Sequence, residues 1–245
     1  MKLYLRNPQN FNSEVLRFYK DNFRLGEEKD ADIIVINDFE PIETDKIVAC
    51  NSTGIEQIKA KEIISLRGED LSGLTAVAEL SICMAGYLMR IFKGEELKEK
   101  TLGIWGIKGR IGRQLKKYAE NMGMKVIGWD KGDSRLNMPM HDCDIVSLNI
   151  TADEENRNFC NKEFFEKMKE EAIFLNSARP WLVDNDALLG ALNSGKLAGA
   201  WTDFEMPFKH KNIMTTDHAG GTTKESKKIS ELIIAKKLCE MQKNK

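Results

Sequence analysis

The 245-residue sequence is informative first for what it lacks. Its five cysteines lie far apart without a Cys-x-x-Cys pair, which argues against a disulfide scaffold and against a metal site. Acidic residues (38) balance basic ones (37), so no basic excess is available to hold nucleic acid. No apolar run approaches the roughly 20 residues that span a bilayer, and the polar, charged start does not resemble a secretory leader. We therefore expect a soluble cytoplasmic protein with no metal, no membrane partner and no nucleic acid partner.

What the sequence does contain is an alternation of short β-rich runs with amphipathic stretches. Runs such as IIVI, IVSL and AIFL are almost continuously apolar, which is typical of parallel strands covered on both faces. The expected strands are residues 32–37, 46–50, 63–66, 101–107, 125–130, 144–150, 172–176, 197–201 and 212–215. The expected helices are residues 13–22, 76–92, 111–122, 162–170, 185–194 and 224–242. This βαβα order predicts an α/β fold with a doubly wound parallel sheet.

Residues 101–130 carry the strongest motif, TLGIWGIKGRIGRQLKKYAENMGMKVIGWD. A strand leads into three glycines, an amphipathic helix follows at once, and a second strand ends in an aspartate. Glycines let backbone amides approach a pyrophosphate, and the helix N-terminus attracts the same anion. The aspartate can bind both hydroxyls of the adenosine ribose, which favours NAD over NADP. The cofactor contacts predicted here are Gly106, Gly109, Arg110, Ile111, Gly112 and Asp130.

Two features of this segment depart from the simplest dinucleotide motif. The spacing is GxxGxxG rather than GxGxxG, so we expect the loop to bulge and Lys108 to face the phosphates. Lys131 and Arg135 follow Asp130, and basic residues there can bind a 2′-phosphate. NADP therefore stays open as an alternative cofactor.

Four further stretches resemble the D-isomer-specific 2-hydroxyacid dehydrogenases, of which this chain would be a shortened member similar to glycerate or phosphoglycerate dehydrogenases. They are VAELSICMAGYLMR (77–90), SLNITADEENRNFCNKEFFEKMKEEAIFLNSAR (147–179), GAWTDFEMP (199–207) and TTDHAGGTT (215–223). More faintly, IVACNSTGIEQI (47–58) resembles the family's substrate-domain loop. The resemblance extends over roughly residues 32–240 in the same order, which makes chance similarity of one motif a poor explanation.

The resemblance implies an NAD-dependent oxidoreductase that transfers a hydride between NAD(H) and a small 2-oxo or 2-hydroxy acid of the D-isomer. Arg179 would hold the substrate carboxylate and carbonyl oxygen with its planar fork of donors. His218 would be the general acid in reduction and the general base in oxidation. Glu205 would bond to this histidine and favour its charged form.

Further contacts follow from the same resemblance. In this family the substrate carboxylate also meets backbone amides of a loop, which here contains Thr53 and Gly54. Asp203 occupies the position where the family binds the nicotinamide carboxamide, and Thr151 is a further expected cofactor contact.

The segment around Glu205 departs from the family pattern. It is compressed to DFEMP (203–207), which leaves the direction of Glu205 open, and Asp217 beside the histidine is an alternative partner. Pro180 replaces the usual glycine after Arg179 and should restrict that arginine to an extended backbone.

We expect two domains with a boundary near Gly73. Residues 74–222 would form the NAD-binding Rossmann domain, and residues 1–73 a smaller flavodoxin-like α/β substrate domain. The C-terminal helix, residues 223–245, would complete the substrate domain. The resemblance also implies a homodimer formed largely through the cofactor domain, with the helix at 77–90 contributing.

Two other functions stay open. The compressed segment and the small substrate domain also suit an NAD(H)-binding regulatory protein with little or no turnover. Formate oxidation on the same scaffold is a third possibility, although the histidine's partner would then be a glutamine, and Glu205 argues against this. Within the dehydrogenase hypothesis, the sequence does not distinguish glyoxylate, hydroxypyruvate, pyruvate, 3-phosphohydroxypyruvate or a bulkier acid.

Overall fold

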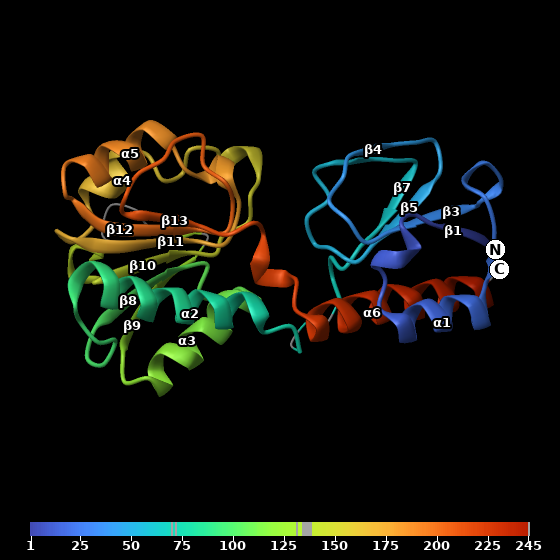
Figure 1. Cartoon of the computed structure of the whole chain (residues 1–245), viewed down its shortest axis with the longest axis horizontal. Coiled ribbons are helices and arrows are strands. Elements are labelled where there is room, and N and C mark those ends of the chain that lie inside the picture. Colours follow the sequence, from blue (N-terminus) through green and yellow to red (C-terminus); the bar gives the residue numbers. More distant parts are fainter. Residues whose placement is uncertain (70, 72, 131, 134–138, 245) are drawn as a thin grey trace. The chain divides into compact units, whose positions relative to one another are not determined.

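The computed structural model describes residues 1–69, 71, 73–130, 132–133 and 139–244. The chain forms two compact units, which are described separately (Figure 1). Unit 1 consists of Met1–Leu74 and Thr222–Lys245, and unit 2 of Thr75–Gly221. Both units are parallel sheets with helices, which confirms the doubly wound α/β fold class predicted from the sequence.

Unit 2 is built on a six-stranded parallel sheet in the order β13-β12-β11-β10-β8-β9. Its strands are β8 (Thr101–Trp105), β9 (Lys125–Trp129), β10 (Ile145–Leu148), β11 (Ala172–Asn176), β12 (Leu197–Thr202) and β13 (Ile213–Thr215). Helices α2 (Ala76–Leu88) and α3 (Arg110–Asn121) cover one face (Figure 1). Helices α4 (Lys162–Glu166) and α5 (Asn185–Asn193) cover the other.

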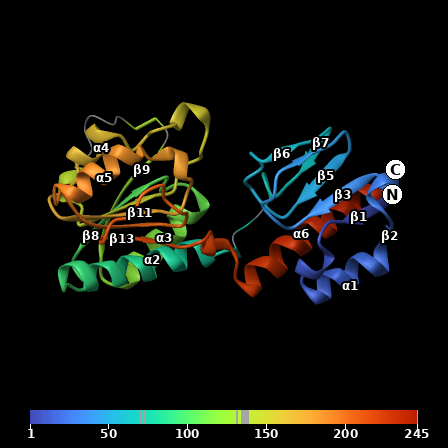
Figure 2. The same cartoon turned by 45° about the horizontal axis from the view of Figure 1, so that its top comes forward.

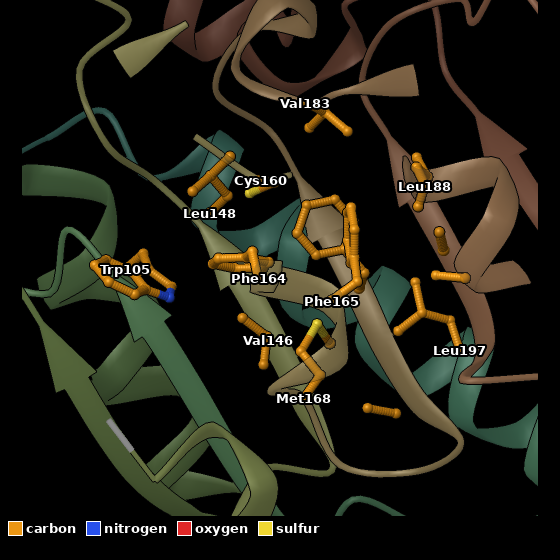
Figure 3. Packing of buried hydrophobic residues seen from close by; sticks show 14 of the residues in the cluster. Trp105, Val146, Leu148, Cys160, Phe164, Phe165, Met168, Val183, Leu188 and Leu197 are labelled. Carbon is orange, nitrogen blue, oxygen red and sulfur yellow. The ribbon is translucent and has the colours of Figure 1, made fainter. Parts of the chain in front are cut away.

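The central strands of unit 2 are apolar on both faces because each face has its own core. In β11, Ile173 and Leu175 join the core under α2 and α3. Phe174 between them joins the second core. Figure 3 shows part of this core, to which α4 contributes Phe164 and Phe165 and α5 contributes Leu188. Alternate residues of a strand point to opposite faces, so a doubly covered strand needs apolar residues throughout.

Unit 1 is a five-stranded parallel sheet in the order β2-β1-β3-β5-β7. Its strands are β1 (Lys2–Leu5), β2 (Arg24–Leu25), β3 (Ile33–Ile36), β5 (Ile47–Cys50) and β7 (Glu62–Ile64). Helices α1 (Ser13–Asn22) and α6 (Lys224–Lys243) lie side by side on one face (Figures 1 and 2). A small parallel sheet of β4 (Ile42–Glu43) and β6 (Ile58–Lys59) belongs to the same unit.

A buried carboxylate fastens α6 to the rest of unit 1. Glu231 of α6 is 1% exposed and accepts hydrogen bonds from the Asn12 amide (2.9 Å) and from Nδ2 of Asn37 (3.3 Å). Asn12 also caps α1, and Asn37 follows β3, so one side chain links three elements that are distant in sequence. Burial raises the pKa of Glu231.

All six expected helices are present, but some ends differ. The helix expected to run to residue 92 is α-helical only to Leu88 and continues as a π-helical turn, η3 (Met89–Lys93), which Gly94 ends in a left-handed conformation. Strands β1, β2, β4 and β6 were not expected from the sequence. The 3₁₀ turns are η1 (Pro8–Asn10), η2 (Glu28–Asp30), η5 (Met140–Asp142), η6 (Glu154–Asn156), η7 (Pro180–Leu182) and η8 (Ala219–Gly221).

Two kinds of feature are missing from the part of the chain that the structure describes. None of its helices combines the length and the apolar character needed to cross a membrane. No three His, Cys, Asp or Glu side chains there are grouped so that they could hold a metal ion.

Candidate active site

The predicted cofactor and catalytic residues of unit 2 follow the ends of its parallel strands. Gly106 directly follows β8, Asp130 follows β9, and Thr151 lies three residues past β10. Arg179, Asp203 and His218 lie just past β11, β12 and β13. The carboxyl ends of parallel strands share one edge of the sheet, and ligands of such sheets bind there, where the strand order reverses. In unit 2 the order reverses between β8 and β10.

At this reversal the backbone is packed too closely for side chains. Gly106 has φ +81°, and a Cβ there would lie 2.4 Å from the carbonyl oxygen of Asn149, which follows β10. A Cβ on Gly112 would lie 2.2 Å from the Gly106 carbonyl oxygen. Gly109 is the N-cap of α3, and no side-chain hydrogen bond caps the helix there. The glycine loop therefore offers an open backbone surface and an uncapped helix N-terminus, which fits a pyrophosphate.

Asp130 ties the glycine loop to the end of β9. It is partly buried, and its Oδ2 accepts a hydrogen bond from the backbone amide of Lys108 (2.8 Å). Lys108 lies within the longer GxxGxxG loop. Its backbone amide is held by this hydrogen bond, although the residue is exposed. Lys131 and Arg135, the basic residues that kept NADP open, lie outside the described residues.

The other predicted cofactor contacts flank this loop. Arg110 and Ile111 form the first turn of α3 and are partly buried. Burial lowers the pKa of Arg110. Thr151 is exposed, and its carbonyl accepts a hydrogen bond from Nδ2 of Asn156 (2.9 Å). All of these residues therefore belong to loops or a helix end at the carboxyl edge of the sheet.

Arg179 is held by a buried asparagine at the end of β11. The side chain of Asn176 accepts a hydrogen bond from the Ala178 amide and donates one to the Arg179 carbonyl, both 3.0 Å long. Arg179 has φ −151° and ψ 149°, which confirms the extended backbone predicted for the residue before Pro180. Its Nη1 donates to the Ala178 carbonyl (2.8 Å), so the guanidinium is folded back on its own turn.

Asp203 is 3% exposed and accepts hydrogen bonds from the turn that follows β13. Its Oδ1 accepts from the Thr216 hydroxyl (2.6 Å) and the Ala219 amide (2.7 Å), and its Oδ2 accepts from the Gly220 amide (2.9 Å). The Asp203 carbonyl accepts a further bond from the His218 amide (3.1 Å). The sequence did not predict this role, because the spacing of the two segments does not reveal which backbone amides face the carboxylate.

His218 adopts a left-handed backbone conformation, φ +50°, which is uncommon outside glycine and asparagine. Burial lowers the pKa of its imidazole, and the positive charge of Arg179 lowers it further. The charges of Asp203 and Asp217 act in the opposite direction. Arg179 and His218 are therefore close enough to interact electrostatically, although they lie 39 positions apart (218 − 179).

Glu205 is not brought to the histidine. It is exposed, and no hydrogen bond joins it to His218 within the described residues. Instead, the ring of Phe204 lies against the imidazole edge-on, with 5.2 Å between the ring centroids. The Thr202 hydroxyl donates to the Phe204 carbonyl (2.7 Å) and fixes this short segment directly after β12.

The predicted substrate loop lies in unit 1, after β5. The hydroxyl of Ser52 accepts a hydrogen bond from the Gly54 amide (3.0 Å), and Nε of Arg67 donates to the Thr53 carbonyl (2.8 Å). Thr53 is exposed, whereas Gly54 is buried. The loop is therefore held in a defined shape by the side chain of Ser52 within it and by that of Arg67, which follows β7.

Comparison with known proteins identifies the family. Residues 83–220 match the model of the D-isomer specific 2-hydroxyacid dehydrogenase, NAD binding domain. The chain is 29% identical to D-3-phosphoglycerate dehydrogenase of Methanocaldococcus jannaschii, over 86% of this chain and 49% of that protein. It is 32% identical to glyoxylate reductase of Thermococcus litoralis, over 64% of this chain and 54% of that protein. The chain thus spans about half the length of these relatives.

A solved structure shows the same fold. The NAD⁺-bound 3-phosphoglycerate dehydrogenase of Entamoeba histolytica superimposes with a TM-score of 0.81 at 20% identity, covering 100% of this chain and 96% of that one. The family match confirms NAD as the predicted cofactor and covers nearly all of unit 2. This chain therefore belongs to the D-isomer specific 2-hydroxyacid dehydrogenase family.

Proposed function

We propose that the chain is an NAD-dependent dehydrogenase that interconverts a small 2-oxo acid and the corresponding D-2-hydroxy acid. The observation that carries the proposal is the family match of unit 2, in which Arg179 and His218 both follow strands at the carboxyl edge of the sheet. An arginine and a histidine are the two groups that such a reduction needs, one to hold a carboxylate and one to supply a proton. The names of the relatives make glyoxylate and 3-phosphohydroxypyruvate the first substrates to test.

The cofactor would bind along the glycine loop. The backbone of Gly106 and Gly109 and the first turn of α3 suit the pyrophosphate, and Asp130 suits the adenosine ribose. Arg110 and Thr151 would flank the same ligand. When bound, NADH supplies the hydride that reduces the substrate.

The side chains of unit 2 would perform the remaining steps. The Arg179 guanidinium would unfold from the Ala178 carbonyl and bind the substrate carboxylate and carbonyl oxygen. The imidazolium of His218 would give its proton to the oxygen of the forming hydroxyl. Since the Arg179 charge lowers the pKa of His218, it favours release of that proton.

We assign Asp203 a positioning role as well as the cofactor contact expected from its place in the sequence. Its three side-chain hydrogen bonds hold the turn that keeps His218 in its left-handed conformation. Such a conformation costs energy and persists only where the surroundings impose it. For the partner of the histidine, we propose Asp217 in preference to Glu205, because Asp217 is the neighbour of His218 in the chain and, after Asp203, raises the pKa of its imidazole, whereas Glu205 is exposed.

A second candidate function is that of an NAD(H)-binding regulatory protein with little turnover. The exposed position of Glu205, which makes no hydrogen bond to His218 within the described residues, favours it. Such a protein would bind NADH but reduce no 2-oxo acid.

We also propose that the chain forms a homodimer through α2. Cys83, Tyr87 and Ile91 are spaced four apart and are all exposed, and Tyr87 and Ile91 are 49% and 57% exposed. Residues at this spacing form one stripe along a helix. An exposed apolar stripe of this kind is typical of an interface between proteins.

The activity itself is tested by following the absorbance of NADH with a panel of 2-oxo acids. We expect turnover on at least one, and Arg179→Ala should raise KM and lower kcat, together about 10²-fold or more, because a charged bidentate contact is lost. NADH affinity should stay unchanged. Arg157→Ala is the matched control, since Arg157 is an exposed arginine of unit 2 that pairs with Glu154. NADH binding without turnover on any acid would favour the regulatory function.

The proton donor is tested by rate and by pH profile. His218→Asn, which tolerates the left-handed backbone, should lower kcat by about 10²–10⁴-fold. Reduction needs the protonated imidazole, so the wild-type rate should fall as pH rises through a pKa below the ordinary histidine value. Asp217→Asn removes a charge that raises this pKa and should move the fall to lower pH, whereas Glu205→Gln should not. A shift of the pH profile in Glu205→Gln but not in Asp217→Asn would instead identify Glu205 as the partner of His218.

The close packing of the glycine loop is tested by two Gly→Ala variants. Gly112→Ala places a Cβ against the Gly106 carbonyl and should weaken NADH binding about tenfold or more, because the helix must move away from the loop. Gly190→Ala in α5 is the matched control, since no atom lies within 4 Å of the added Cβ. This control should bind NADH normally and gain up to about 1 kcal/mol in stability. Fluorescence titration with NADH measures the affinity of both variants. Equal affinities would contradict the proposal that the glycine loop binds the pyrophosphate.

The dimer is tested by Ile91→Glu, which places a charge at the end of the proposed apolar stripe, in the turn η3 that continues α2. Light scattering should give the mass of two chains for the wild type and of one chain for the variant. Lys116→Glu, on the exposed side of α3, is a control for charge alone. A wild type that is monomeric at micromolar concentration would refute the proposal.

A further inference from the structure

Thr216, the residue that follows β13, uses each of its polar atoms in a hydrogen bond. Its amide donates to the Thr202 carbonyl (3.0 Å), and its carbonyl accepts from the His218 amide (3.1 Å). Its hydroxyl donates to Oδ1 of Asp203 (2.6 Å) and accepts from Nε1 of Trp201 (3.0 Å). One threonine thus joins strand β12, the buried carboxylate and the turn that carries the histidine.

The two partners of the Thr216 hydroxyl fix the direction of its proton. An indole N–H can only donate a hydrogen bond, and a carboxylate can only accept one. The Thr216 oxygen must therefore accept from Trp201, and its single proton must point to Asp203. A hydroxyl between a pure donor and a pure acceptor has one arrangement, whereas a hydroxyl in water has many.

Trp201 connects this hydroxyl to the core of unit 2. Its side chain is fully buried and belongs to the core under α2 and α3. Strands β12 and β13 are paired in parallel, which brings Trp201 beside Thr216 (Figure 1). Side chains in a close-packed core have little room to move. The indole N–H is therefore held in a fixed position from which it directs the hydroxyl.

The backbone of His218 depends on the two residues that this hydroxyl joins. Its amide donates to the Thr216 carbonyl and to the Asp203 carbonyl, both at 3.1 Å. The left-handed conformation of His218 persists only where its surroundings impose it. A side chain that transfers a proton must also be held to within about 0.5 Å of its productive position. The hydrogen bond between Thr216 and Asp203 keeps both acceptors of the His218 amide in place.

We propose that Thr216 and Trp201 are positioning residues for His218. The Thr216 hydroxyl, directed by the indole N–H of Trp201, ties the histidine turn to Asp203 and to the core of unit 2. Both residues act through the backbone of His218. This inference rests on the proposed dehydrogenase function, in which His218 is the proton donor.

The kinetic test replaces the hydroxyl and measures kcat at a pH where the imidazole is protonated, so that a change reports position rather than charge. Thr216→Val should lower kcat about tenfold, the equivalent of one hydrogen bond to a charged group. KM for the 2-oxo acid should change by less than about twofold, because Arg179 binds the substrate. Thr216→Ser keeps the hydroxyl and should restore kcat. Thr215→Val, at the exposed threonine next to it, is the matched control and should leave kcat unchanged.

Trp201→Phe separates the indole N–H from the packing of the ring. The variant keeps an aromatic side chain in the core but removes the donor to Thr216. It should lower kcat less than Thr216→Val does, because the hydroxyl can still reach Asp203 without being directed there.

A second measurement needs no turnover. The full chain has three histidines, and NMR titration of the labelled protein follows each imidazole, with His218→Asn identifying one signal by its loss. Burial and the charge of Arg179 lower the pKa of His218, and the charges of Asp203 and Asp217 raise it. Release of the turn in Thr216→Val weakens the dominant effects, so the pKa should rise toward the ordinary histidine value. Thr216→Ser and Thr215→Val should keep the wild-type pKa.

These two measurements distinguish failure of this inference from failure of the proposed function. A wild type that turns over no 2-oxo acid contradicts the dehydrogenase function, and the titration then decides whether Thr216 positions His218. Trp201→Phe/Thr216→Val removes both polar groups, leaves no unpaired indole donor, and serves as the test if Thr216→Val fails to fold. It should show the same rise in the His218 pKa. An unchanged pKa in a folded variant without the hydroxyl would overturn the proposal, as would a serine variant that behaves like the valine variant.

Discussion

The architecture of unit 2 depends on one close approach of backbone to backbone. At the point where the strand order reverses, the turn after β8, the end of β10 and the first turn of α3 leave no room for a Cβ at Gly106 or Gly112. This contact aligns α3 with its N-terminus toward the carboxyl edge of the sheet. The remaining strands are all paired in parallel, so the loops that carry Arg179 and His218 open on the same edge. A single steric constraint therefore determines where an anion can approach and where the polar side chains collect.

Buried carboxylates provide a second constraint on the fold. Burial of a carboxylate costs free energy unless hydrogen-bond donors surround its oxygens. Asp203 meets this condition with one hydroxyl and two backbone amides, and the result is a rigid turn around His218. Glu231 in unit 1 accepts hydrogen bonds from Asn12 and Asn37, and for this group burial outweighs them and raises the pKa. Each carboxylate links segments that are far apart in sequence, which explains why polar residues occur in otherwise apolar surroundings.

The parts of this structure that the sequence predicted are those determined by local patterns. The glycine loop was predictable because spacing, flanking strand and following helix all belong to one segment. The extended backbone of Arg179 was predictable because Pro180 restricts the residue before it. Strand β1 was not, since its sequence KLYL is only four residues long and too short for its alternation to be distinctive. Its neighbour β2 has two residues and exists only through pairing with β1.

The candidate site was less predictable because it depends on segments that are distant in sequence. The resemblance supplied Arg179, Glu205 and His218 as a set, but proximity depends on how each segment leaves its strand. The compressed segment after β12 brings Phe204 to the imidazole and leaves Glu205 exposed.

An unsatisfied group is equally invisible in a sequence. Trp105 and Trp201 both end or nearly end a strand of the same sheet, yet only one finds an acceptor. Trp201 meets the Thr216 hydroxyl because β12 and β13 are paired, which brings the two residues together across the sheet. Nε1 of Trp105, by contrast, is buried and meets no acceptor within the described part of the chain. Whether a buried polar atom is paired therefore depends on the neighbouring strand and helix rather than on its own segment. Sequence motifs alone do not reveal such atoms.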